Sequence, residues 1–222
     1  MHVVHVSTAD GLAKLAAARA AGWTASAETC PHYLWFTHEA FERIGPALKC
    51  APPVRDGANR ERLWRALLTG LVNVIGSDHS PCPAAMKTRG DTNVWEAWGG
   101  VAGIQATLPV LLTEGVQRRG FPWERLADLT ATAPAKLYGL HPRKGEIAVG
   151  ADADLTLVDP DRRWTFTRDM LQTKSGISPY LGAEFHGAVV RTIVRGRTVF
   201  ADGQVVGTPG FGQFVARGSR AD

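Results

Sequence analysis

Three side chains that can bind a metal ion stand near the ends of separate predicted strands: His5, His32 and Asp78. Two imidazoles and a carboxylate form a ligand set that suits zinc, and also cobalt or manganese. A divalent ion in such a site lowers the pKa of water and so provides hydroxide at neutral pH. Asp78 can bind the ion and also accept a proton from that water. The pattern indicates metal-dependent hydrolysis, with Asp78 as the catalytic base.

The remaining histidines are weaker candidates. His79 directly follows Asp78, and we expect it to orient the site without binding the metal itself. His2 faces the opposite side of its strand from His5, because side chains alternate along a strand. We assign the other four histidines to packing or to the surface: His2, His38, His141 and His186.

These candidates need elements that bring strand ends together. Strands and helices alternate along the first 80 or so residues, which predicts parallel βα units. The carboxyl ends of such strands meet at one face, where catalytic groups collect. The expected strands are 3–7, 23–28, 48–51 and 71–77, and the expected helices are 9–21, 39–44 and 59–69.

The second part of the chain has a different character. After a loop at 81–100, helices are expected at 104–117, with a kink or restart at Pro109, and at 123–131 and 134–140. Strands rich in β-branched residues follow at 155–158, 189–195 and 198–200, with tight turns at 195–196 and 202–203. We place a domain boundary near Pro142, which gives one domain at 1–141 and a small β-rich region with its tail at 142–222.

Composition excludes several functions. The chain has 222 residues, is 45% hydrophobic and 21% charged, and its net charge of +4 is scattered, so neither disorder nor nucleic-acid binding is indicated. No apolar stretch is long enough to cross a bilayer, and the N-terminus does not resemble a signal peptide. Three cysteines cannot all pair, so we interpret them as small buried residues in a reducing cytoplasm.

Several long motifs resemble the cyclic amidohydrolases, the group that includes allantoinase, dihydroorotase and hydantoinase. The motifs shared with the group are ETCPHYL at 28–34, KCAPPVR at 49–55 and GSDHSPCP at 76–83. Three others resemble the allantoinases within it: MK at 86–87, WGGVAGIQ at 98–105 and KSGISPY at 174–180. The resemblance covers essentially the whole chain in order.

The resemblance implies an α/β fold: the C-terminal half of a (β/α)8 barrel of a metal-dependent hydrolase, followed by part of a small β-sandwich. It also implies a site with two divalent ions, most often zinc, and hydrolysis of a cyclic amide such as allantoin to allantoate. An HxH pair and a carbamylated lysine that complete this site in the family have no counterpart here. We therefore expect a chain that begins inside a buried strand and carries only the second half of the site.

Substrate contacts are also suggested by the resemblance. Dihydroorotases carry an asparagine where this chain has Ala51, and hydantoinases tend to carry one in the loop where this chain has Gly99 and Gly100. We therefore expect backbone groups around Cys50, Ala51, Gly99 and Gly100 to contact a small cyclic ureide. Glycine permits such close approach of backbone to ligand.

Two alternatives remain beside an allantoinase. One is a dihydroorotase-type or hydantoinase-type cyclic amidase. The other is a catalytically inactive truncated fragment, or one subunit of a split enzyme, whose partner is a complementary N-terminal half or a second copy of the chain. Membranes and nucleic acids are not expected partners.

Overall fold

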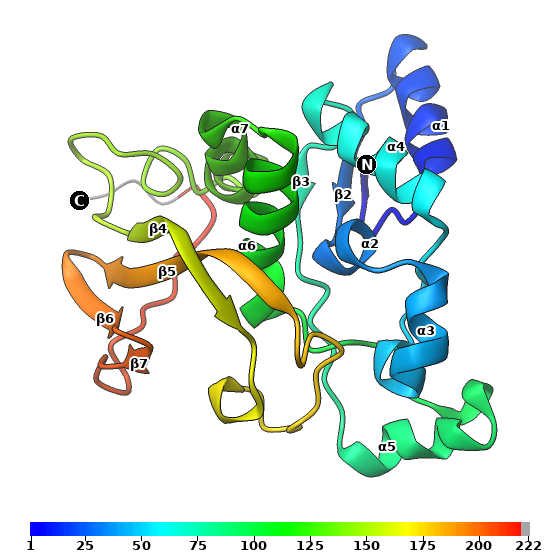
Figure 1. The fold of residues 1–222 in the computed structure, drawn as a ribbon. Helices are drawn as coiled ribbons and strands as arrows, with labels where there is room; N and C mark the ends of the chain where they lie inside the picture. The colour runs from blue at the N-terminus through cyan, green and yellow to red at the C-terminus, as the bar shows by residue number, and fades with distance from the viewer. Residues whose placement is uncertain (219–222) are drawn as a thin grey trace.

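The computed structural model describes residues 1–218 and contains a parallel and an antiparallel sheet (Figure 1). The parallel sheet has the order β1-β2-β3, formed by β1 (His2–Val3), β2 (Ser26–Thr29) and β3 (Val74–Ile75). Hydrogen bonds beyond the strands lock their ends: the Val6 amide donates to the Glu28 carbonyl at 2.8 Å, and the Gly76 amide to the Thr29 carbonyl at 3.1 Å. Three of the expected strands are therefore present, in shorter form.

The fourth expected strand is wrong. Residues 48–51 form the end of a 3-10 helix, η1 (Gly45–Leu48), and then irregular chain. Leu48 and Cys50 are both buried, which imitates the alternation of a strand. The Lys49 carbonyl, however, accepts a hydrogen bond from the Lys87 side chain, and Pro52 has no amide to offer a neighbouring strand.

Helices α1 and α4 lie on one side of the parallel sheet (Figure 1). The helices of this half are α1 (Ala9–Ala20), α2 (Pro31–Trp35), α3 (His38–Ile44) and α4 (Gly57–Leu68). Thr8 caps α1 by accepting from the Gly11 amide, and Gly22 follows its end with a φ of 89°. The cap of α4 is Asp56, whose carboxylate accepts from the Asn59 amide at 2.7 Å.

The helices of the middle segment join into longer runs. After α5 (Ala84–Thr88) and the 3-10 turns η2 (Arg89–Asp91) and η3 (Val94–Glu96), a continuous helical run joins η4 (Ile104–Ala106), α6 (Thr107–Val110) and the π-helix η5 (Leu111–Gln117). The helix changes from 3-10 to α geometry at Thr107, which agrees with the restart expected near Pro109, and Pro109 stands in the first turn of α6. A second run joins α7 (Trp123–Ala127), the π-helix η6 (Asp128–Thr132) and α8 (Ala133–Leu137).

The antiparallel sheet has the order β4-β5-β6-β7. Its strands are β4 (Leu155–Thr165), β5 (Glu184–Val194), β6 (Arg197–Ala201) and β7 (Gln204–Val205), with the 3-10 turn η7 (Arg168–Met170) between the first two. Both expected tight turns are confirmed. Arg195 and Asp202 have positive φ, each is followed by a glycine with positive φ, and each pair joins two strands directly.

One hydrophobic core connects the two sheets. The helical run that includes α6 stands between them in Figure 1, and its π-helix contacts β5. Phe166, Tyr180 and Phe185 of the second region belong to the same buried cluster as Leu34 and Trp64 of the first. The second region therefore packs against the first through aromatic side chains.

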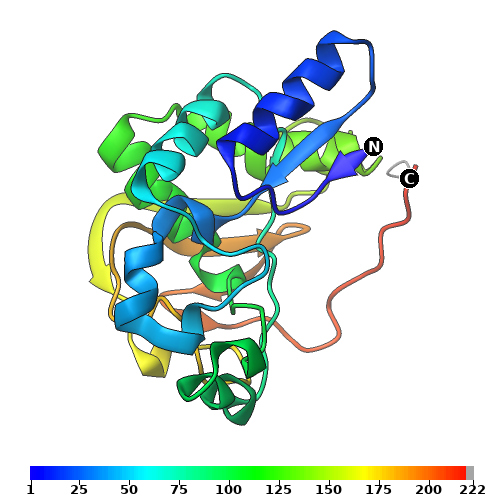
Figure 2. The same cartoon turned by 90° about the vertical axis from the view of Figure 1, so that its right-hand side faces the viewer.

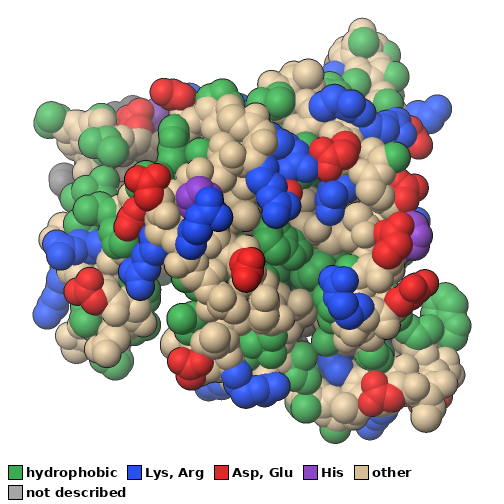
Figure 3. Space-filling model, viewed as in Figure 1, with side chains coloured by type: hydrophobic (Ala, Val, Ile, Leu, Met, Phe, Trp, Pro, Cys, Tyr) green, Lys and Arg blue, Asp and Glu red, His purple; other side chains and the backbone are tan. Residues whose placement is uncertain are grey.

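The outer surface shows no concentration of one charge on the face drawn in Figure 3, where basic and acidic side chains are interspersed. Beyond β7, the chain leaves the sheet as an extended trace (Figure 2), and the Gly218 amide donates to the Gly139 carbonyl at 2.8 Å. None of the helices described is both long and apolar enough to span a membrane.

Candidate metal and catalytic site

His32 lies in the first turn of α2, directly after β2. Cys30 is the N-cap of this helix and Pro31 its first residue, a position where proline's missing amide has no consequence. His32 has 0% exposure, and both of its ring nitrogens lack a hydrogen-bond partner. Burial lowers the pKa of His32 to about 3, with a further contribution from His5. His32 is therefore a neutral imidazole with free lone-pair and N–H positions inside the protein.

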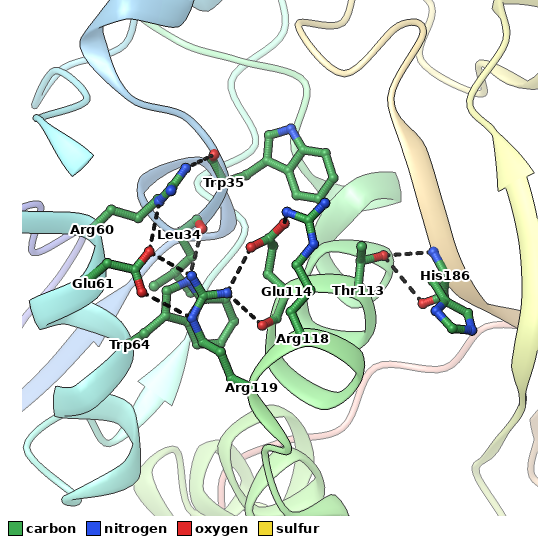
Figure 4. Close-up of polar contacts among 10 residues, drawn as sticks. All are labelled: Leu34, Trp35, Arg60, Glu61, Trp64, Thr113, Glu114, Arg118, Arg119 and His186. Atoms are coloured by element: carbon green, nitrogen blue, oxygen red, sulfur yellow. Dashed lines mark hydrogen bonds and ion pairs between the residues drawn. The ribbon is translucent and has the colours of Figure 1, made fainter. Parts of the chain in front are cut away.

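Two side chains of α4 hold the end of α2 (Figure 4). The Trp64 indole donates to the Leu34 carbonyl at 3.0 Å, and Arg60 donates to the Trp35 carbonyl at 3.1 Å. These carbonyls have no partner within so short a helix. The contacts fix the orientation of α2 and thus of His32.

An ion-pair network in turn joins α4 to the π-helix η5. In Figure 4, Arg119 lies between the carboxylates of Glu61 and Glu114. Its guanidinium donates to Glu114 at 2.8 Å and to Glu61 at 2.6 Å, and lies over the Trp64 ring at 4.9 Å. Arg118 also pairs with the buried Glu114 carboxylate.

His5 and Asp78 share an unusual backbone conformation. Their φ angles are 40° and 44°, in the left-handed region that side chains with a Cβ rarely adopt. The other non-glycine residues of positive φ in the described chain, Arg195 and Asp202, belong to hairpin turns that require it. His5 and Asp78 instead follow β1 and β3, and strained residues of this kind gather at functional sites.

The structure brings His32 and Asp78 together, with Cys30 as a third donor. One ligand atom of each lies within 4.8 Å of the others. His5 is not a member of this group, although its charge acts on the pKa of both His32 and Asp78. Burial raises the pKa of Asp78, and His5 partly offsets this rise. A carboxylate with a raised pKa accepts a proton more readily.

These residues fit a divalent metal ion. A buried imidazole without any hydrogen-bond partner is rare unless a metal or a ligand completes it. The donor atoms of His32, Asp78 and Cys30 are nitrogen, oxygen and sulfur, the three types that zinc accepts.

His79 holds the chain that follows the site. Its Nδ1 accepts from the Gly103 and Ile104 amides at 3.2 and 3.4 Å, which places the ring proton on Nε2. A bridge between His79 and Val101 continues the parallel arrangement. His79 thus anchors the start of η4.

The two segments expected to bind substrate lie against each other. A Cβ at Gly99 would be 3.5 Å from the Ala51 side chain, and a Cβ at Gly100 would be 2.5 Å from Ser80. Burial raises the pKa of Cys50 to about 11, and the charge of Asp78 adds to this rise. The expected substrate segments and Asp78 therefore belong to one region of the molecule.

Comparison with known proteins identifies the family. Residues 2–199 match the model described as "Amidohydrolase family". The chain belongs to this family. One curated relative of this amidohydrolase is an allantoinase of Rubrobacter xylanophilus, 51% identical over 215 residues, which are 97% of this chain and 46% of the relative. An allantoinase of Escherichia coli O139:H28 is 37% identical over 98% of this chain and 47% of its own length.

Solved structures of hydantoinases share the fold of this amidohydrolase. The L-hydantoinase (dihydropyrimidinase) of Arthrobacter aurescens matches with a TM-score of 0.94 and 40% identity, over 97% of this chain and 48% of that one. The dihydropyrimidinase of Brevibacillus agri gives 0.92 and 35%, over 100% and 49%. The expected fold class is confirmed, and the chain spans about half the length of the relatives it matches.

Sequence reasoning did not single out three residues of this region. All three cysteines are buried free thiols, as interpreted, but Cys30 also contributes to the donor group. Its place directly before Pro31 and His32 was the available signal. Lys49 and Lys87 stand inside recognised motifs, yet the burial of Lys87 is not apparent from sequence alone.

Proposed function

We propose that the chain forms the second half of the active site of an enzyme that hydrolyses a cyclic amide, with allantoin as the substrate and allantoate as the product. One observation carries this proposal. His5 and Asp78 both have left-handed backbone in the segments that leave β1 and β3 of one parallel sheet. His5 influences the pKa of His32 and of Asp78, and Asp78 influences the pKa of Cys30 and Cys50. The names of the curated relatives favour allantoin over other cyclic amides.

His5, His32 and Asp78 would hold a divalent metal ion, for which zinc is our first choice. Such an ion supplies Lewis acidity, which polarises a carbonyl and lowers the pKa of water. Asp78 takes a proton from the attacking water as the water oxygen bonds to the ring carbonyl carbon. It then delivers that proton to the ring nitrogen as the carbon–nitrogen bond breaks, so one residue serves as base and then as acid.

Backbone groups around Cys50, Ala51, Gly99 and Gly100 would orient the ring. The proximity of Gly99 to Ala51 supports their joint use, because a Cβ added at Gly99 would lie only 3.5 Å from the Ala51 side chain. Hydantoin differs from allantoin by the absence of the ureido group. A preference for allantoin would therefore come from polar contacts to that group.

A complementary N-terminal half would supply the remaining ligands. We propose the cytoplasm as the compartment, where three free buried thiols stay reduced.

The test is reconstitution. Co-expression of the chain with the part of the Rubrobacter xylanophilus allantoinase that it does not match gives a completed enzyme. We expect zinc-dependent hydrolysis of allantoin that is at least tenfold faster than that of hydantoin or dihydroorotate, and we expect Asp78→Asn to reduce kcat by roughly 10³ or more. Turnover that persists in Asp78→Asn would overturn the catalytic assignment.

Metal content separates the ligand assignments. His5→Ala, His32→Ala and Cys30→Ser in the completed enzyme are compared by metal analysis after dialysis. Loss of zinc in the first two and its retention in Cys30→Ser supports the assigned ligands. The reverse result would replace His5 by Cys30 as the third ligand.

A further inference from the structure

Lys87 is a buried lysine between the two segments expected to bind substrate. The residue is 5% exposed, and its ammonium group donates to the Lys49 carbonyl and to the Trp98 carbonyl, both at 2.9 Å. One carbonyl directly precedes Cys50 and the other directly precedes Gly99. A single side chain therefore connects two segments that are about 50 residues apart in sequence.

Lys49 makes the reciprocal connection. Its ammonium group donates to the Ala97 carbonyl at 2.7 Å and to the Trp95 carbonyl at 3.0 Å. The Trp98 amide also donates to the Met86 carbonyl at 3.0 Å, beside Lys87. Charged donors make hydrogen bonds about twice as strong as neutral ones. The two segments are thus held together by the charge of two lysines.

Burial of the Lys87 ammonium group costs free energy, so packing alone does not account for a lysine at this position. Burial lowers the pKa of Lys87 to about 8; Cys82 and Cys50 partly oppose this fall, and the charge of Lys49 adds to it. No carboxylate pairs with the Lys87 ammonium among the described residues. A buried ammonium held only by backbone carbonyls is unfavourable compared with an apolar residue of the same size.

Lys87 also borders a third motif. A cavity of about 10 Å³, close to the space of one water, is lined by Lys87, Gly100, Ser175 and Pro179 among others. Residues 86–87, 98–105 and 174–180 are the three motifs that resemble allantoinases in particular. Residues of all three motifs line this cavity, although the motifs are distant in sequence.

We propose that Lys87 is a positioning residue that sets the spacing between the substrate-binding segments 49–51 and 98–100. This inference rests on the proposed function for the identity of those segments. Lys87 does not touch the reacting atoms. It holds two carbonyls in place so that the neighbouring backbone of Cys50, Ala51, Gly99 and Gly100 meets the substrate ring in one geometry.

The kinetic test uses Lys87→Met in the completed enzyme, since methionine fills a similar space without charge or donors. We expect KM for allantoin to rise about tenfold or more while kcat stays within about threefold, because positioning of bound substrate is lost and the base is not. Zinc content should stay unchanged. Lys49→Met, which removes the reciprocal connection, should raise KM in the same direction.

The control is Lys144→Met. Lys144 also donates to two partners, Asp152 at 2.7 Å and Asp154, but it lies in the second region and away from the expected substrate segments. It should leave KM and kcat unchanged. An unchanged KM in Lys87→Met would overturn the proposal. Lys87 would then be a structural lysine, even if Lys87→Met and Lys144→Met both lower thermal stability.

A second measurement does not depend on catalysis. Hydrogen exchange of the chain alone should become faster at 49–51 and at 98–100 together in Lys87→Met, and at neither in Lys144→Met. Exchange could become faster at both segments while the completed wild-type enzyme fails to hydrolyse allantoin. That result would contradict the proposed function but would support the connection made by Lys87. Unchanged exchange at both segments would contradict the connection itself.

Discussion

A histidine that is enclosed without partners makes the folded protein sensitive to acid. His32 is fully buried, and burial lowers its pKa to about 3. Its ordinary value in an unfolded chain is near 6.5. Below that value the unfolded chain takes up a proton that the folded chain refuses, so stability is complete above about pH 6.5 and is lost as the pH falls toward 3.

We therefore predict that His32→Gln flattens the acid limb of the stability curve. The difference in slope should approach about 1.4 kcal/mol per pH unit between pH 6 and pH 4, with wild type the steeper. Urea unfolding at several pH values in the presence of a chelator measures it. Parallel slopes for the two proteins would contradict the burial of a neutral imidazole.

Two adjacent glycines should respond differently to a methyl group. A Cβ at Gly100 would stand 2.5 Å from Ser80 Cβ and 2.7 Å from its backbone carbonyl, whereas a Cβ at Gly99 would meet nothing nearer than 3.5 Å. We predict that Gly100→Ala lowers the free energy of unfolding by about 1–3 kcal/mol through overpacking. Gly99→Ala is the matched control, with stability close to wild type. If both variants are equally stable in thermal unfolding, the backbone around Gly100 accommodates the added methyl group without cost, which would contradict the prediction.

At the scale of elements, the ion pairs around Arg119 dock the π-helix onto α4. Glu114 is 4% exposed and is paired by Arg119 and by the mostly exposed Arg118. Arg119→Met leaves the buried carboxylate with one solvated partner, and we predict a loss of about 3 kcal/mol. Denaturant unfolding measures this loss. Arg62→Met, which breaks an exposed pair with Asp10, should not change stability measurably.

Periodicity and capping signals were sufficient for several elements. The helix expected at 39–44 and the Arg195 and Asp202 turns are confirmed, because spacing and turn glycines act locally. The end of α1 before Gly22 is confirmed for the same reason. Local signals failed where distant groups decide the outcome. The Lys49 carbonyl bonds to Lys87 rather than to a strand, which no window of sequence around 48–51 reveals.

The candidate site was predictable in part. Strand ends identified His32 and Asp78 as neighbours, and the donor group contains both. The left-handed backbone of His5 depends on tertiary structure, and so does the approach of Cys30 to Asp78. His5, His32 and Asp78 as metal ligands therefore stay a prediction for the metal analysis to decide.

At the scale of the whole molecule, both sheets have open edges. Within residues 1–218, β1 and the 11-residue β4 are each at the edge of a sheet. Exposed edges present amide and carbonyl groups to any neighbour. Val4 beside β1 is also 44% exposed, and Leu157 on β4 is 42% exposed.

We predict that the chain alone self-associates or aggregates at about 20 µM, a concentration at which open edges become a hazard. Light scattering coupled to size-exclusion chromatography measures this. Addition of the complementary half that completes the enzyme should replace the self-associated species by a single defined complex. A monodisperse monomer with a cooperative thermal transition would refute the open-edge argument.

The aromatic contacts between the two regions have one more consequence. Trp35, the last residue of α2, packs on Phe185 of β5 with ring centroids 5.1 Å apart, and the next residue, Phe36, packs on Tyr180 at 4.8 Å. His32 belongs to that same short helix. The aromatic side chains of the second region therefore support the short helix that carries His32. If His32 binds metal as we propose, substitutions at Phe185 should change metal affinity from a distance, so the two regions would be under joint selection.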